Sequence, residues 1–354
     1  MAFQYIPNIA VKGMAACVPK KIEDNRELSL FETEDDRNKF IQATGILKRH
    51  TVKGSDLCAS DLCFQAAETL LAEIGWERSE IGYLIFVSQT PDYIFPATAC
   101  ILQNRLGLSQ ECYAMDISLG CSGWVYGLTT IASLLSSSVN MKKGLLLVGD
   151  TTTITKSPKD KSTYPLFGDA GTATAVQYEE GSIGLKIHAA TDGSSHKAIM
   201  IPDGGFRNFF SSDSLVEHEI EPGIVRNSLQ SILDGPGVFT FGITKAPKSI
   251  SSVLEYFDIK IDAIDYLVLH QANKMMNEKI RKKLKIEPEK VPYSLPEYGN
   301  TSSSSIPLTM VSQLCDPLRF RHNVIVACGF GVGLSWASVI LETNKIVCPP
   351  VIEI

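Results

Sequence analysis

Three polar residues carry side chains suited to covalent chemistry, and each lies close to a change in local sequence pattern. Cys121, in ISLGCSGW (117–124), stands between a strand-like run and a helix-like run. A thiol there can act as a nucleophile or can simply fill space in the core. His270 ends an apolar run, which also fits a structural histidine. Asn300, in YGNTSSSSIP (298–307), is equally suited to capping a turn.

Other sites are disfavoured by the pattern of cysteines and glycines. No CxxC motif and no zinc-like Cys/His spacing occur among the nine cysteines, so we expect no metal and reduced thiols in the cytoplasm. No GxGxxG opens a helix after a strand, which argues against a dinucleotide cofactor. Glycines interrupt the strand-like sequence in GFGVGLSW (329–336), a pattern typical of a bulge or a close backbone approach.

Composition narrows the class of protein further. The chain has 354 residues, is 44% hydrophobic and carries a net charge of −6, as expected for a globular protein with a sizeable core. No long basic run is present, so a nucleic-acid partner is not expected. No apolar stretch is long enough for membrane insertion, and the N-terminal sequence lacks the pattern of a secretory signal. We therefore expect a cytoplasmic protein.

Alternating strand and helix patterns must position the three residues. Apolar runs predict strands at 83–89, 112–118, 144–150 and 172–178, and helical spacing of apolar residues predicts helices over 60–75 and 122–138. This alternation predicts an α/β fold with a largely buried sheet.

Three segment pairs suggest an internal duplication. IGYLIFVSQ, LTTIASL and GLLLVGD are followed, 180 to 183 residues later and in the same order, by IDYLVLHQA, LTMVSQL and VIVACGF. We therefore predict one half over 1–178 and a second over 179–354. The polar stretch 202–223 looks like an insertion that covers a surface or a pocket.

The duplication predicts where the reactive residues meet. Shifting Cys121 by 180 residues gives Thr301, which is adjacent to Asn300. Cys121 and Asn300 would then lie on equivalent turns of the two halves, with His270 at the end of another strand. A pseudo-twofold arrangement of the halves can bring these ends together.

The motifs GCSG, FGDAGT, HQAN, GNTS and GFGVGLSW, in this order and at about this spacing, resemble the thiolase superfamily and, more closely, the ketoacyl-ACP synthase III enzymes. The resemblance covers nearly the whole chain. It implies a thiolase-like five-layered α-β-α-β-α fold, a homodimer and no cofactor. It also implies a decarboxylative Claisen condensation of an acyl thioester with malonyl-ACP, in fatty-acid or specialised lipid or polyketide biosynthesis.

The resemblance also assigns roles. Cys121 becomes the acylated nucleophile, and a helix N-terminus there is expected to lower its pKa. The backbone N–H groups of Cys121 and Val332 form the oxyanion hole, while His270 and Asn300 stabilise the enolate left by loss of CO₂. Phe95, in YIFPATAC, matches a residue that reaches the partner subunit's acyl pocket, although a core phenylalanine before a proline turn fits equally well.

The pattern departs from the family where substrates enter. Lys39 and Ala43 replace a tryptophan and an arginine that hold coenzyme A's adenine, and Lys161 replaces a further arginine of that site. These changes remove the surface on which adenine stacks. They argue against an acetyl-CoA primer bound in the usual way.

The contacts to the carrier protein differ as well. Met275 and Thr240 stand where the family has basic residues. The helix after HQAN is still basic and can meet an acyl carrier protein or pantetheine phosphates, or it can be a solvated face. Its basic residues are Lys279, Arg281, Lys282, Lys283 and Lys285.

These observations predict a specialised synthase III-like enzyme that uses an acyl-ACP or an unusual acyl-CoA thioester. An alternative keeps the acylated Cys121 but transfers the acyl group to an alcohol or amine. A non-catalytic partner subunit of a heterodimeric synthase is disfavoured because Cys121, His270 and Asn300 are all present. Thiolase or hydroxymethylglutaryl-CoA synthase chemistry is possible in principle, and thiolases typically need a second cysteine, such as Cys328, but the HQAN and GNTS motifs favour the decarboxylating branch.

Overall fold

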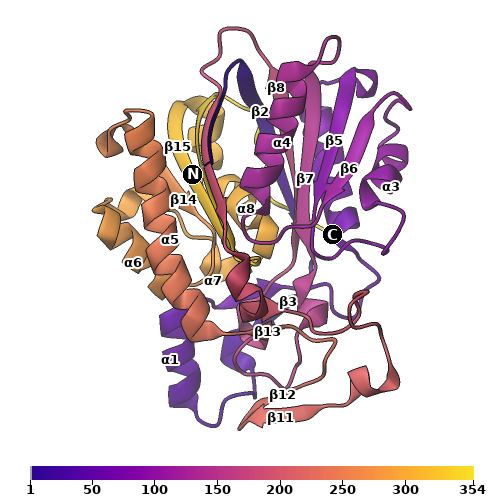
Figure 1. Cartoon of the computed structure of the whole chain (residues 1–354), viewed down its shortest axis with the longest axis vertical. Coiled ribbons are helices and arrows are strands. Elements are labelled where there is room, and N and C mark those ends of the chain that lie inside the picture. The colour runs from indigo at the N-terminus through magenta and orange to yellow at the C-terminus, as the bar shows by residue number, and fades with distance from the viewer. Residues whose placement is uncertain (1) are drawn as a thin grey trace.

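The computed structural model describes residues 2–354 and is built around two mixed sheets (Figure 1). The first sheet has the strand order β17-β2-β8-β7-β5-β6 and contains β2 (Ile9–Val18), β5 (Ile81–Val87), β6 (Tyr113–Ile117), β7 (Lys143–Asp150), β8 (Ala170–Tyr178) and β17 (Ile352–Glu353). The second has the order β1-β9-β16-β15-β14 and contains β1 (Ala2–Ile6), β9 (Leu185–Thr191), β14 (Tyr266–Leu269), β15 (His322–Gly331) and β16 (Ser335–Asn344).

Helices form three layers around these sheets, as the three apolar clusters of the core show. One cluster joins the outer face of the first sheet to two helices, α2 (Ala59–Ile74) and α3 (Thr98–Arg105). A second lies between the sheets and includes α4 (Gly123–Ser137) and α8 (Ser305–Gln313). A third joins the second sheet to α5 (Gly235–Tyr256) and α6 (Lys274–Leu284). The predicted five-layered α-β-α-β-α fold is confirmed.

The central strands and the helices between the sheets are covered on more than one side, which explains their apolar sequences. β5 and β7 are covered on both faces, so both read as nearly continuous apolar runs. α4 buries a wide apolar face that includes Trp124 and Leu128. Gly127 lets this helix approach both β5 and β7, because a Cβ there would lie 2.7 Å from side-chain atoms of Val87 and Leu146.

The paired segments found in the sequence occupy equivalent places. IGYLIFVSQ and IDYLVLHQA contain β5 and β14, and each strand is parallel to its neighbour, β7 or β15. LTTIASL and LTMVSQL belong to α4 and α8, the two helices between the sheets. The predicted boundary at 178/179 falls between β8 and β9, which lie in different sheets, while β1 and β17 each pair in the sheet of the other half.

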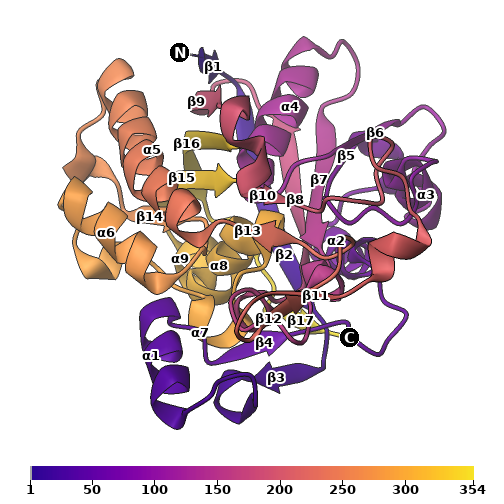
Figure 2. The same cartoon turned by 60° about the horizontal axis from the view of Figure 1, so that its bottom comes forward.

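Smaller elements gather at one end of the two sheets (Figure 2). Three two-stranded sheets pair β3 (Ile22–Asp24) with β4 (Lys48–His50), β10 (Ile199–Met200) with β13 (Ile232–Leu233), and β11 (His218–Glu221) with β12 (Ile224–Arg226). The remaining helices are α1 (Glu34–Thr44), α7 (Leu295–Tyr298) and α9 (Cys315–Phe320). Within residues 2–354, no helix is long and apolar enough to cross a membrane.

Candidate active site

Cys121 lies between β6 and α4, two residues before the helix begins, and only 7% of it is exposed. The glycine-rich end of β15 packs directly against it. A Cβ at position 331 would lie 2.7 Å from both Cβ and Sγ of Cys121, and one at 329 would lie 2.7 Å from its carbonyl oxygen. Glycine is therefore required at both positions by close approach, and this approach brings the Val332 backbone within hydrogen-bonding reach of the thiol.

The prediction of a lowered pKa for this thiol is wrong. Burial raises the pKa of Cys121 to about 11, although hydrogen bonding to the Val332 backbone and the Ser302 side chain acts in the opposite direction. Desolvation of the thiolate outweighs the backbone donors near the start of α4. Cys121 is therefore a neutral thiol near pH 7.

His270 directly follows β14, which pairs with β15. Its ring is 2% exposed, and its Nδ1 lies 2.7 Å from Oγ of Ser305 at the start of α8. Burial lowers the pKa of His270 to about 3, with hydrogen bonding to the Ser302 backbone opposing this shift. The imidazole is neutral at physiological pH.

Asn300 is held by the segment that carries the FGDAGT motif. Its backbone N–H donates to Leu166 O at 2.9 Å, and its carbonyl accepts from the Gly168 N–H at 3.0 Å. The side-chain Oδ1 accepts from the Ser302 N–H at 2.9 Å. That bond fixes the amide orientation and leaves the NH₂ group as a donor for a ligand.

Asp150 holds the backbone segment that follows Asn300. It is a further polar residue of the site that was not predicted from the sequence. It ends β7, is fully buried, and accepts from the Ser303 Oγ at 2.6 Å and from the Gln89 N–H at 2.7 Å. Burial raises the pKa of this carboxyl group, and its hydrogen bonds partly offset that shift. A charged residue ending an otherwise apolar strand was the available signal.

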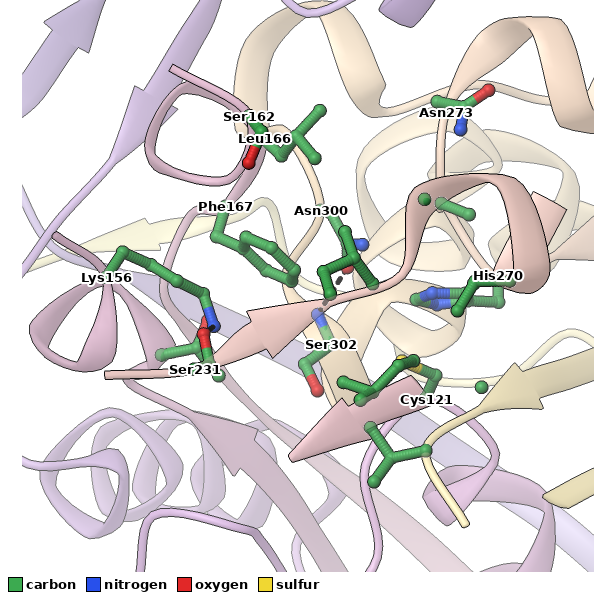
Figure 3. Close-up of a pocket in the computed structure, with 18 of the residues that line it drawn as sticks. Cys121, Lys156, Ser162, Leu166, Phe167, Ser231, His270, Asn273, Asn300 and Ser302 are labelled. Carbon is green, nitrogen blue, oxygen red and sulfur yellow. Dashed lines mark hydrogen bonds between the residues drawn. The ribbon is translucent and has the colours of Figure 1, made fainter. Parts of the chain in front are cut away.

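The four predicted residues of the catalytic centre line one cavity of about 450 Å³, within the roughly 300–1,000 Å³ usual for small-molecule sites (Figure 3). These residues are Cys121, His270, Asn300 and Val332. Cys328 lies in β15, outside the cavity lining, and its burial raises the pKa of its thiol to about 12. Within residues 2–354 no cluster of His, Cys, Asp and Glu could hold a metal ion.

The segment 202–223 contributes no residue to this lining. Residues on either side of it do line the cavity, namely Ile201 before the segment and Ser231 after it. The segment forms part of the outer surface, with Phe206 and Phe209 strongly exposed.

The residues predicted at the substrate entrance lie outside the lining of the cavity. Lys39 and Ala43 on α1 share a shallow surface depression with Met275 on α6. Phe95 is 78% exposed and does not line the cavity. Lys161 also lies outside the lining and is 3.6 Å from Glu32.

The basic helix is α6. Lys279 Nζ lies 5.0 Å from the centre of the Phe239 ring, and Phe239 lines the cavity. Lys282 and Lys283 occupy the last turn, where cations also stabilise the helix dipole. Arg281 instead pairs with Glu278 on the same helix.

Two further residues of the cavity had no clear signal in the sequence. Ser302 lies within the polar run of the GNTS motif, where its neighbours look the same. Lys156 lies in a polar segment of the sequence, yet only 6% of it is exposed. The burial of Lys156, which follows the run TTTIT, could not be predicted from its own sequence neighbours, because it depends on β10 and β13, which come later in the chain.

Comparisons with known proteins agree with this geometry. The family model described as 3-oxoacyl-(acyl-carrier-protein) synthase III matches residues 115–193, and the model of its C-terminal part matches 254–343. The chain is 32% identical to beta-ketoacyl-(acyl-carrier-protein) synthase III of Rhodopirellula baltica, over 95% of this chain and 99% of that protein. The chain belongs to the 3-oxoacyl-ACP synthase III family.

Solved structures of 3-oxoacyl-(acyl-carrier-protein) synthases share the fold over nearly the full chain. The 3-oxoacyl-(acyl-carrier-protein) synthase of Burkholderia xenovorans LB400 superimposes with a TM-score of 0.93 at 35% identity, covering 100% of this chain and 99% of that one. The synthase III of Pseudomonas aeruginosa PAO1 gives a TM-score of 0.83 at 30% identity, covering 96% and 99%. The prediction of a thiolase-like condensing enzyme of the synthase III type is confirmed.

Proposed function

We propose that this protein condenses an acyl group, first transferred to Cys121, with a malonyl thioester that loses CO₂. The observation that carries the proposal is the shared cavity, where a buried thiol, a neutral imidazole and an oriented amide face one another. Family membership supports the same reaction. The chain's own residues and the two thioesters account for every step, without a metal or an organic cofactor.

In the first half-reaction, Cys121 Sγ attacks the thioester carbonyl of the primer. A new C–S bond forms, the donor's thiolate leaves, and the proton of Cys121 ends on that leaving thiol. The backbone N–H groups of Cys121 and Val332 stabilise the oxyanion.

In the second half-reaction, the malonyl thioester loses CO₂ and the electron pair of the broken C–C bond forms an enolate. With the Ser305 hydroxyl donating to Nδ1, neutral His270 carries its proton on Nε2, and this N–H donates a hydrogen bond to the enolate oxygen. The Asn300 NH₂ group donates to the same oxygen. The enolate carbon then attacks the acyl-Cys121 carbonyl, which releases a 3-oxoacyl product and the thiolate.

The test is intact-protein mass spectrometry after brief exposure to panels of acyl-CoA and acyl-ACP donors. We expect a mass gain that persists in the control Cys100→Ala and disappears in Cys121→Ala. Adding malonyl-ACP should discharge the acyl group with one CO₂ per turnover. Discharge by an alcohol or amine without CO₂ would instead support an acyltransferase, and absence of any adduct would contradict the proposal.

The proposal also covers the identity of the acyl donor and of the carrier protein. Lys39, Ala43 and Met275 replace the residues expected to hold coenzyme A and the carrier protein, so we propose an acyl-ACP or an unusual acyl-CoA donor in a specialised pathway. Normal saturable turnover with acetyl-CoA and malonyl-ACP would contradict this.

We also propose a homodimer in which Phe95 reaches its partner. The exposed apolar side chains of Tyr93, Ile94 and Phe95 support an interface there. Light scattering on the wild type and Phe95→Ser tests it, and a monomeric wild type would contradict it.

A further inference from the structure

Lys156 is a buried lysine inside the candidate active-site cavity that the condensation mechanism does not use. It follows the short 3-10 helix Thr152–Thr155 at the end of β7 and lines the same cavity as Cys121. Figure 3 shows its side chain entering on the side opposite His270, with Phe167 and Asn300 between the two.

The ammonium group is incompletely satisfied. Lys156 Nζ donates to Ser231 Oγ at 2.6 Å and, more weakly, to Thr155 Oγ1 at 3.4 Å. It also lies 4.1 Å from the centre of the Phe167 ring. An ammonium has three N–H donors, so these two hydroxyl groups leave one for a ligand.

No carboxylate neutralises this cation. Among residues 2–354, Lys156 forms no ion pair, although Asp150, Asp169 and Asp160 act on it at longer range. Burial lowers the pKa of Lys156 to about 8, although these longer-range negative charges act in the opposite direction. A buried cation without a partner is unfavourable, and an anion brought by a ligand would compensate it.

Ser231 belongs to the part of the chain that closes the cavity. Its backbone N–H donates to Thr155 O at 3.0 Å, directly beside Lys156. The next two residues form β13, which pairs with β10, and both strands contribute to the lining. The cation is thus held on two sides, by the segment after β7 and by this small sheet.

We propose that Lys156 and Ser231 form a subsite for a carboxylate on the acyl group that is transferred to Cys121. The primer is then a half-thioester of a dicarboxylic acid rather than a plain aliphatic acyl group. This inference rests on the proposed function, because it assigns the substrate of the first half-reaction.

The alternative ligand, the carboxylate of the malonyl extender, is disfavoured by the chemistry. Loss of CO₂ moves negative charge from the carboxylate to the enolate, so a cation bound to that carboxylate would stabilise the ground state and slow the reaction. His270, which is assigned to the enolate, approaches from the other side of the cavity (Figure 3).

The experiment compares pairs of pantetheine thioesters, which avoids any dependence on adenine or carrier-protein contacts. Succinyl, glutaryl and adipyl donors are matched with analogues in which an isopropyl group replaces the carboxylate. The initial rate of Cys121 acylation is followed by intact mass. Binding of the same thioesters to Cys121→Ala is followed by calorimetry, which does not require the covalent step.

We expect at least one carboxylated donor to be preferred over its isopropyl analogue by about tenfold to a hundredfold, the range for a hydrogen bond to a charged group. Lys156→Met keeps most of the side-chain volume and should abolish or reverse this preference. Ser231→Ala should weaken it. Lys159→Met, at an exposed lysine paired with Glu217, is the matched control and should leave it unchanged.

Three outcomes would overturn the subsite. They are a wild-type preference for the isopropyl donors, an equal loss of both donors in Lys156→Met, and failure of every donor both to acylate the wild type and to bind Cys121→Ala. Preferential binding of carboxylated donors to Cys121→Ala without acylation of the wild type would instead support the subsite and contradict the acylation chemistry of the proposed function.

Discussion

The inner end of the cavity and the outer surface between α1 and α6 are built in opposite ways. At the inner end, Cys121, His270 and Asn300 are each at most 7% exposed and are held by backbone or hydroxyl contacts at fixed distances. On the outer surface, Lys39 pairs only with Asp35 on its own helix, and Met275 is exposed.

This difference in burial and hydrogen bonding indicates where substitutions are tolerated. The inner residues match the synthase III motifs one by one, whereas the outer ones depart from them. A change at the inner end must disturb a packed network, whereas a change outside alters only exposed contacts. Chemistry and substrate entry are therefore separable, and the size of a mutational effect should fall from the inner end outward.

The largest effect is expected for Asn300→Ala. Removing one preorganised donor to a developing oxyanion costs about 10²- to 10³-fold in rate. The loss should fall on condensation, measured as CO₂ release, whereas acylation of Cys121 should persist. Asn300 also accepts from the Ser302 N–H, so Asn300→Asp serves as a control that keeps this acceptor without the NH₂ donor. Full condensation activity in both variants would refute the assigned role.

A smaller but still large effect is expected for Gly331→Ala. The added Cβ would lie 2.7 Å from Sγ and Cβ of Cys121, so the loop or the thiol must shift. Overpacking of this kind costs about 1–3 kcal/mol, which corresponds to roughly tenfold to a hundredfold in acylation rate if the shift displaces the Val332 N–H. Gly205→Ala has no atom within 4 Å of the new Cβ and is the matched control. Unchanged acylation in Gly331→Ala would show that the loop adapts freely.

The pH dependence of Cys121 alkylation tests the electrostatics of the inner end. With its pKa raised by burial to about 11, the thiol is protonated at pH 7, and the thiolate fraction rises about tenfold per pH unit until the pKa is reached. Iodoacetamide labelling of Cys121, followed by peptide mass spectrometry between pH 6 and about pH 9, should rise at that slope. Neutral His270, with its pKa lowered to about 3, adds no further step in this range, whereas Lys156, with its pKa lowered to about 8, titrates within it. A plateau near pH 7 would mean that the backbone donors outweigh burial.

Residues in motifs and in central strands were the most predictable from the sequence. β5, β7 and α4 were predictable because burial on both faces leaves a simple apolar pattern. The internal duplication then paired β5 with β14 and α4 with α8. It indicated that Cys121 and Asn300 would meet, because equivalent turns of two stacked halves face each other.

The features of the site that could not be predicted from the sequence depend on contacts between segments far apart in the chain. The raised pKa of Cys121 results from burial by the loop around Gly331, more than 200 residues away in the chain, which a helix-dipole argument ignores. Lys156 is polar in sequence and is buried only because Ser231 and the β10–β13 sheet close over it. Asp150 resembles any strand end until Ser303 is placed beside it. In each case a local pattern carries no information about the later segment that decides the environment.

The smallest effect is expected on the outer surface, at the basic turn of α6. Charge reversal in Lys282→Glu/Lys283→Glu should raise KM for malonyl-ACP by about two- to fivefold at low salt, because exposed pairs contribute about 0.2–1 kcal/mol each. The effect should fade as ionic strength shortens the screening length, and kcat should stay constant. Lys20→Glu/Lys345→Glu produces the same change in net charge at two exposed lysines outside α5 and α6, and controls for long-range attraction. Because lysines in the last turn also stabilise the helix dipole, the melting temperature is measured beside KM. A KM increase that persists at high salt, or one matched by the control pair, would show that α6 does not meet the carrier protein through these charges.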